Sequence, residues 1–234
     1  MSNIINIETS GKICSVALTR DGVLERQLDD DRGMQHANVL APFVDDLMEE
    51  CHHREMMPDA VAVSIGPGSY TGLRIGLSLA KGLAFSLGVP LIGVDTLKIL
   101  AVKAMFRTMD WQGDEVLVPM IDARRMEVFT APYDFALNPL ETPGAKILDE
   151  NSFAELLESR QLYFMGDGAE KAKNVITHPN AHFIDGLLPQ AKDMLALSEK
   201  ALREGDFLDI AYSTPNYLKE YQTTTPRDPF AGIG

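Results

Sequence analysis

A turn with three glycines holds the residues whose types and spacing most directly suggest chemistry. Gly66, Gly68 and Gly72 separate a strand-like apolar run from a helix-like run, the arrangement in which a helix N-terminus binds phosphate. A P-loop needs a Lys-Ser/Thr pair after its last glycine, but this chain has Leu73-Arg74. A dinucleotide fingerprint needs G-x-G-x-x-G, whereas one extra residue here gives G-x-G-x-x-x-G. Neither phosphate template is met.

The same turn has an ordinary structural explanation. Pro67 stiffens it, and Ser69 or Thr71 can cap the helix that follows. Arg74 stands in the first helical turn, where a cation opposes the helix dipole, so we expect it to pair with an acid or with a partner chain. Asp95, which ends the next predicted strand, keeps a dinucleotide site open as an alternative.

The helix after this turn carries small residues at every fourth position. One row contains Gly72, Gly76, Ala80, Ala84 and Gly88, and a second contains Ser78, Gly82 and Ser86. Because four residues turn the helix by about 400°, each row stays on one side. Glycine inside a helix costs about 1 kcal/mol relative to alanine, so we expect close backbone approach to offset that cost. The approaching element is either a helix of another chain or the helix's own sheet.

Composition and charge exclude several classes of protein. The 234 residues include 34 acids and 21 bases, for a net charge of −13, so the isolated chain should repel a phosphate backbone. Apolar runs are shorter than the ~20 residues of a membrane span. The opening MSNIINIETS lacks the basic and apolar regions of a signal peptide. The two cysteines, Cys14 and Cys51, have no metal or redox spacing. We therefore expect a cytoplasmic protein without membrane contact.

The order of elements repeats along the chain. Three strand-like runs open it, at INIET, ICSVALT and VLERQL, and the glycine turn and small-residue helix follow an amphipathic helix. After residue 110 the order of three strands, helix, strand, helix, strand, helix begins again. This pattern predicts a duplicated α/β architecture. We expect one subdomain at 1–110, a second at 111–211 and an extended C-terminal arm at 212–234.

Six stretches together resemble one known family, TsaB, also called YeaZ. They are IETSGKICSVAL, QHANVLAPFVDDLM, SIGPGSYTGLRIGLSLAKGLAFSLGVPLIGVDTL, PMIDARRMEVF, FMGDGAEK and YLKEY. The resemblance implies an α/β fold of the actin-like ATPase (ASKHA) type, built from two RNase H-like subdomains with mixed sheets flanked by helices. It further implies a non-catalytic role in forming N6-threonylcarbamoyladenosine in tRNA, beside the paralogue TsaD and the ATPase TsaE. Contact with tRNA would then be indirect, through the complex.

The resemblance raises the question of a metal site like that of TsaD, which needs His-x-x-x-His on the first helix. Such spacing places two imidazoles on one face. This chain has His36 but Leu40. We therefore expect no metal and no catalytic residues here, and interpret His36 as a cap or surface hydrogen-bonding residue.

Nucleotide binding or hydrolysis is the alternative function that the superfamily suggests. Actin-like ATPases bind phosphates and magnesium at two hairpins and contact the nucleoside from a later loop. The candidate positions here are Glu8, Thr9 and Ser10, then Asp122, then Gly166, Asp167 and Gly168. Each also has a simple turn or capping explanation. We expect no cofactor in the isolated chain, with ATP or ADP at a subunit junction of the complex as the exception.

The preferred prediction is a scaffold that forms a homodimer or docks TsaD through its first two helices. A helix of small residues permits close contact across the joint. The residues expected at this interface are His36, Leu40, Phe43, Val44, Leu47, Gly72, Arg74, Gly76, Ala80, Leu83 and Ala84.

Overall fold

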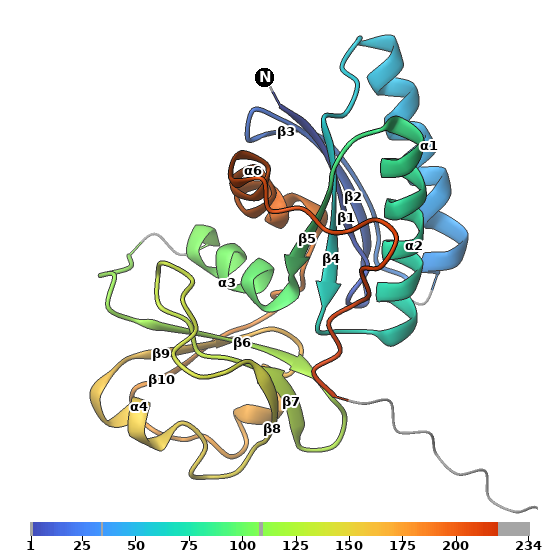
Figure 1. Ribbon diagram of the computed structural model, residues 1–234. Helices are drawn as coiled ribbons and strands as arrows, with labels where there is room; N and C mark the ends of the chain where they lie inside the picture. Colours follow the sequence, from blue (N-terminus) through green and yellow to red (C-terminus); the bar gives the residue numbers. More distant parts are fainter. Residues whose placement is uncertain (1, 34, 108–109, 220–234) are drawn as a thin grey trace, which may run out of the picture.

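The computed structural model describes residues 2–33, 35–107 and 110–219. Its first sheet has the strand order β3-β2-β1-β4-β5 (Figure 1). The strands are β1 (Asn3–Glu8), β2 (Cys14–Arg20), β3 (Val23–Asp30), β4 (Ala60–Gly66) and β5 (Leu91–Asp95). β1 runs antiparallel to β2, with Ile5 opposite Leu18, and parallel to β4. Hairpins thus form one half of the sheet, and crossovers through helices form the other.

The second sheet repeats this topology in the order β10-β9-β6-β7-β8. Its strands are β6 (Val116–Asp122), β7 (Glu127–Thr130), β8 (Gly144–Ile147), β9 (Leu162–Met165) and β10 (Ala181–Ile184). β6 pairs antiparallel with β7 and parallel with β9, as β1 does with β2 and β4. The predicted duplication is confirmed, and the fold class is that of two RNase H-like subdomains with mixed sheets.

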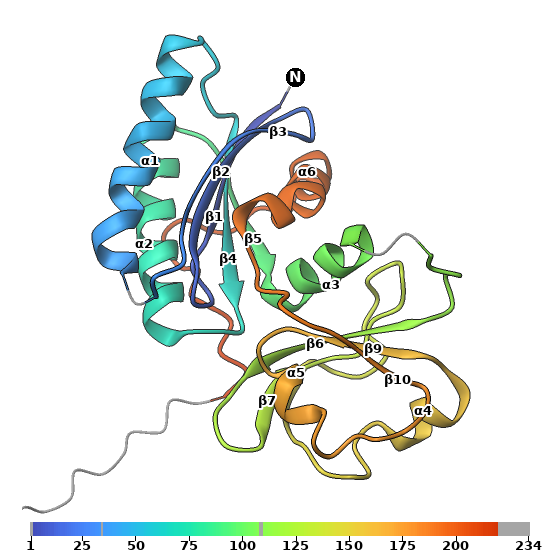
Figure 2. The same ribbon diagram turned by 180° about the vertical axis from the view of Figure 1, so that it is seen from behind.

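Two long helices cover one face of the first sheet, α1 (His36–His53) and α2 (Tyr70–Leu87) (Figures 1 and 2). The alternation of side chains along β1 decides which residues meet them. Ile5 and Ile7 join the cluster that contains Leu40 and Leu77, whereas Ile4 joins a cluster on the opposite face. Both faces of the central strand are therefore buried.

Short helices complete the second subdomain. They are α4 (Ala154–Ser159) and α5 (Ala169–Ala172). Their apolar side chains join a core with Val118 and Phe164 of the sheet, and Phe153 packs edge-on against Phe164 with ring centroids 5.6 Å apart. The helix α3 (Thr96–Arg107) lies between the two sheets, because Leu97 and Leu100 share a cluster with Leu117 of β6.

The chain returns to its first sheet near its end. The 3-10 helix η1 (Ala191–Met194) and the helix α6 (Leu195–Glu204) lie on the face of that sheet opposite α1 and α2 (Figure 2). Met194 is buried in one cluster with Ile4 and Ile92, and Leu197 packs against it. The segment 111–211, which we expected to form the second subdomain, thus contributes its last helices to the first.

Candidate functional site

Three buried polar residues, Glu8, Thr9 and Ser10, lie where β1 leads into the turn toward β2, and we call them the polar corner. Glu8 and Thr9 are fully buried, and Ser10 is nearly so. Glu8 Oε1 accepts the N–H of Ser10 at 2.6 Å, but Glu8 Oε2, Thr9 Oγ1 and Ser10 Oγ find no hydrogen-bond partner. Burial raises the pKa of Glu8 to about 7, although the hydrogen bond from the N–H of Ser10 acts to lower it.

The glycine turn packs directly on this corner. Ser69 donates its N–H to the carbonyl oxygen of Ser10 at 2.7 Å, and its Oγ caps α2 by accepting the N–H of Gly72. A methyl group on Gly68 would lie 2.5 Å from the carbonyl oxygen of Ser10, and one on Gly72 would lie 2.1 Å from that of Thr9. The glycines therefore permit close packing of two backbone segments.

A second polar group lies at the hairpin of the other subdomain. Asp122 donates its N–H to Asp167 Oδ1 at 2.9 Å, and its carboxylate forms an ion pair with Lys171. Although burial acts to raise the pKa of Asp122, the hydrogen bonds from Lys171 and from the N–H of Arg124 hold it below its usual value. The nearby ammonium of Lys12, on the first hairpin, contributes in the same direction.

The glycines beside Asp167 are also places of close packing. A methyl group on Gly166 would lie 2.2 Å from the carbonyl oxygen of Met120, and one on Gly168 would lie 2.9 Å from Val128 Cγ1. The candidate nucleotide residues thus form two separate groups. Thr9 and Ser10 are covered by the glycine turn and α2, Glu8 is buried on the opposite face of the sheet near Asp193 of η1, and the carboxylate of Asp122 is engaged by Lys171. As arranged, these residues do not fit a nucleoside triphosphate with its magnesium ion.

Asp95, the residue that kept a dinucleotide site open, caps α3. Its Oδ1 accepts the N–H groups of Leu97 and Lys98 at 2.8 and 3.1 Å. Burial raises its pKa, and the two backbone hydrogen bonds act to lower it.

His36 lies on α1 without a second histidine beside it. Its ring is buried and its Nε2 has no hydrogen-bond partner, so the interpretation as a surface residue is wrong. Leu40, one turn later, is buried in the apolar core. Among the described residues, no group of three His, Cys, Asp or Glu side chains could hold a metal ion.

Most of the predicted interface residues lie in the core of the chain itself. Those buried are His36, Leu40, Val44, Leu47, Gly72, Gly76, Ala80 and Ala84. The inward row of α2 is filled by the residue that follows β1, since a methyl group on Gly76 would lie 2.2 Å from Thr9 Oγ1. The chain's own residues therefore occupy the Gly72–Ala84 row, and the expectation that a neighbouring subunit occupies it is wrong.

The second small-residue row of α2 faces outward instead. Ser78, Gly82 and Ser86 are exposed, and a methyl group on Gly82 would meet no atom within 4 Å. Phe85 is 79% exposed beside them, and Ile75 is half-buried. We call Ile75, Ser78, Gly82, Phe85 and Ser86 the outer face of α2.

Half-buried apolar side chains continue this surface toward α1. Leu79 and Leu83 of α2, and Val39 and Phe43 of α1, all pack partly against the core below them. Two of the predicted interface residues, Phe43 and Leu83, are therefore placed where a partner could reach them.

Arg74 contacts the C-terminal arm rather than an acid. Its Nε donates to Tyr217 Oη at 3.0 Å, and its guanidinium carbon lies 4.0 Å from the ring centroid of Tyr70. The two tyrosine rings are 5.0 Å apart. The expected pairing of Arg74 with an acid is therefore wrong among the residues that the structure describes.

The C-terminal arm was expected to pack on the body or on a partner, and its described residues pack on α2 and on both sheets. Lys81 of α2 donates to the carbonyl oxygens of Ala211 and Ser213. The N–H of Asn216 donates to the carbonyl oxygen of Ile65 at 2.7 Å. Lys219 then forms an ion pair with Glu127 of β7 at 2.6 Å. The aromatic residues of the tail were the sequence signal that it packs on the body.

Comparison with known proteins gives consistent results. The family model described as "TsaD: tRNA N6-adenosine threonylcarbamoyltransferase" matches residues 32–227. The tRNA threonylcarbamoyladenosine biosynthesis protein TsaB of Escherichia coli is 30% identical over 222 residues, which cover 92% of this chain and 94% of that protein.

Solved structures resemble the chain over most of its length. YeaZ from Pseudomonas aeruginosa has a TM-score of 0.79 and 31% identity, covering 93% of this chain and all of that one. An inorganic polyphosphate/ATP-glucomannokinase from Arthrobacter has a TM-score of 0.50 and 12% identity, covering 87% of this chain and all of that one, a likeness of fold alone. No helix among the described residues is long and apolar enough to cross a membrane.

Proposed function

The chain belongs to the TsaB (YeaZ) family, and on this premise we propose that it is a non-catalytic subunit of the complex that forms N6-threonylcarbamoyladenosine in tRNA. Its role is to dimerise and to bind and activate TsaD, together with TsaE. The complex would carry the tRNA, and the net charge of −13 is consistent with indirect contact. The proposal places the protein in the cytoplasm.

The first α1 residues support a non-catalytic role. A transferase of the TsaD type holds its metal between two histidines one helical turn apart, and Leu40 stands where the second is required. Leu40 is buried, and an apolar side chain supplies no ligand atom. The chemistry would therefore belong to the paralogue, and this subunit would act by favouring its active conformation.

The outer face of α2 carries the proposal. Gly82 is exposed in the middle of a helix, where it costs about 1 kcal/mol relative to alanine. Phe85 beside it is 79% exposed. A partner helix that packs closely on Ser78, Gly82 and Ser86 would offset the cost of the glycine and bury the phenyl ring. The half-buried Phe43 and Leu83 would extend the contact.

Size-exclusion chromatography with TsaD, with and without TsaE and ATP, tests this surface. Gly82→Leu should abolish both the homodimer and TsaD capture, because its side chain fills the space a partner helix needs, and the monomer should keep its circular dichroism spectrum. Ala154→Leu, on the exposed side of α4, is the matched control and should associate normally. Normal association of folded Gly82→Leu would exclude this face. Reconstituted tRNA modification tests the assignment as a whole.

A nucleotide-hydrolysing activity is the second candidate. It is favoured by the unpartnered polar atoms of Glu8, Thr9 and Ser10, because buried orphans of this kind call for a ligand or a water. Magnesium-dependent turnover of labelled ATP by the purified chain would establish it. We expect none from the chain alone, since all three residues are buried, Thr9 and Ser10 beneath the glycine turn and α2 and Glu8 on the opposite face of the sheet.

A further inference from the structure

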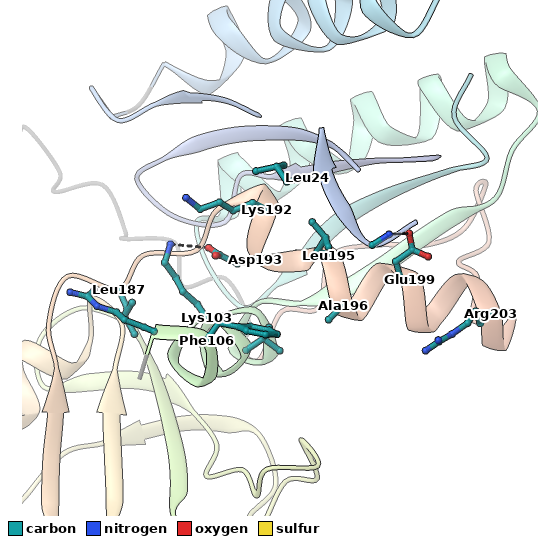
Figure 3. A pocket seen from close by; sticks show the side chains of 13 residues that line it. Leu24, Lys103, Phe106, Leu187, Lys192, Asp193, Leu195, Ala196, Glu199 and Arg203 are labelled. Atoms are coloured by element: carbon teal, nitrogen blue, oxygen red, sulfur yellow. Dashed lines mark hydrogen bonds and ion pairs between the residues drawn. The ribbon is translucent and has the colours of Figure 1, made fainter. Parts of the chain in front are cut away.

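A cavity of about 760 Å³ lies on the side of the molecule away from α1 and α2. Its walls are α3, the η1–α6 segment and the hairpin between β2 and β3 (Figure 3). Its volume is in the range that small-molecule sites occupy. None of the residues assigned to the proposed interface or to the nucleotide alternative lines it, so the function above does not use it.

The floor of the cavity is apolar. Val102 and Phe106 of α3, Leu187, Leu195 of α6 and Leu24 of the hairpin contribute to it. Phe106 is 77% exposed and Leu24 is 41% exposed. Large apolar side chains that gather at one hollow and remain exposed there indicate a site for an apolar group.

Basic residues surround this floor. Lys103, Arg107, Lys192 and Arg203 line the cavity with only two carboxylates, those of Asp193 and Glu199. Lys103 and Lys192 lie at one end in Figure 3, and Arg203 at the other, near the end of α6. The chain as a whole has a net charge of −13, so this excess of cations runs against its overall charge.

Both carboxylates are already engaged within the chain. Asp193 pairs with Lys103 at 2.8 Å, and Glu199 accepts the hydroxyl of Ser2 at 2.9 Å and the N–H of Gly22 at 3.0 Å. Asp193 also feels the charge of Lys192, but neither carboxylate forms an ion pair with Arg107, Lys192 or Arg203.

Three cations have no carboxylate within ion-pair distance among the described residues. They are Arg107, Lys192 and Arg203, of which Arg107 donates to a backbone carbonyl oxygen, that of Asp185, at 3.1 Å. Cations held beside an apolar floor favour an anion that itself has an apolar body.

We propose that this cavity binds a small amphiphilic anion, of the class of a medium- or long-chain carboxylate. Its chain would lie on Phe106, Leu187 and Leu195, and its carboxylate would face Arg107, Lys192 and Arg203, the cations without an ion pair among the described residues. A neutral or cationic amphiphile of the same length would bury the same apolar surface without the charge attraction, and so should bind more weakly.

Titration calorimetry of the full chain with dodecanoate, kept below its micelle concentration, tests this site. We expect saturable binding with one ligand per chain. Dodecyltrimethylammonium should bind at least about tenfold more weakly, as expected for replacing a favourable charge contact of about 1 kcal/mol or more by an unfavourable one. Equal binding of the two probes would overturn the proposal, as would the absence of saturable binding of dodecanoate.

Two pairs of matched variants locate the site. Lys192→Glu should weaken dodecanoate binding by about tenfold, whereas Lys200→Glu, on an exposed position of α6 outside the cavity, should change it less than about twofold. Phe106→Ala should weaken binding, and Ile147→Ala, similarly exposed on β8 and outside the cavity, should not. Equal losses within either pair would show non-specific adsorption and overturn the proposal.

Discussion

The buried carboxyl of Glu8 makes the stability of this protein depend on pH. Its pKa in the folded chain is about 7, against 4.5 for an ordinary glutamate, because burial disfavours the ionised form. The folded state therefore binds this proton more tightly than the unfolded state does. Stability from this group is fully present below pH 4.5 and is lost as the pH rises to 7.

Glu8→Gln should remove this dependence, because the amide is neutral at every pH and can still accept the N–H of Ser10. At pH 8 the free energy of unfolding of the variant should exceed that of the parent by up to about 3 kcal/mol. At pH 4.5 the two should be equally stable. Urea denaturation at both pH values measures the difference.

Glu49→Gln is the control for that comparison, since Glu49 is exposed on α1. It should leave the pH dependence as it is in the parent. A Glu8→Gln variant that is equally or less stable than the parent at pH 8 would show that folding does not raise the pKa of this carboxyl.

Residue types alone identified the candidate nucleotide positions but not their surroundings. Thr9 and Ser10 could be recognised as hydroxyls at a hairpin turn. Their coverage by α2 depends on a tertiary contact. Gly68 and Gly72 lie so close to the hairpin backbone that no methyl group would fit between them. Arg74 is similar, because its partner Tyr217 lies 143 residues away in the chain and no local pattern connects the two.

Helix α2 has two small-residue rows with opposite roles. The row that contains Gly72 and Gly76 touches the backbone and side chain of Thr9, and the row that contains Gly82 is open. The sequence predicts both rows equally well, because a spacing of four fixes only which residues share a side. Which row faces inward is decided by the sheet beneath it.

Alanine substitution separates the two rows. Gly72→Ala should lower the free energy of unfolding by about 2 kcal/mol or more, because the methyl group would collide with the carbonyl oxygen of Thr9. Gly82→Ala should raise it by about 0.5–1 kcal/mol, because it meets no atom and alanine is the better helix former. Thermal and urea denaturation measure both.

A stable Gly72→Ala variant would mean that α2 and the first hairpin can move apart at little cost. In that case the covered corner at Thr9 and Ser10 would be open to a ligand, and the nucleotide alternative would gain support.

At the scale of the whole molecule, the duplicated sheet order could be predicted from the sequence. The return of the last helices to the first sheet could not. Alternating apolar strands and hairpin turns are local signals, and they recur in both halves. The packing of Met194 with Ile4 and Ile92 in one cluster joins residues between one hundred and two hundred positions apart. An amphipathic helix indicates that it covers an apolar surface, but not which of two similar sheets provides it.

Met194→Ala should therefore destabilise the first subdomain although it lies far along the chain. Loss of a fully buried methionine typically costs about 2–5 kcal/mol, and Met194 is completely buried. Hydrogen exchange should show the loss of protection in β1 and β5, on the first sheet. Lys200→Ala, exposed on α6, should leave exchange unchanged. Loss of protection confined to the second sheet would contradict the packing of the η1–α6 segment on the first sheet.

The late return of the chain has a consequence for synthesis on the ribosome. β5 is an edge strand whose Leu91 carbonyl oxygen accepts the N–H of Leu208 at 2.8 Å, and Met194 covers Ile92 from the side. Translation at roughly 5–20 residues per second leaves both contacts unmade for several seconds after β5 has emerged. During this interval the nascent chain presents an open sheet edge and is a natural client for a chaperone.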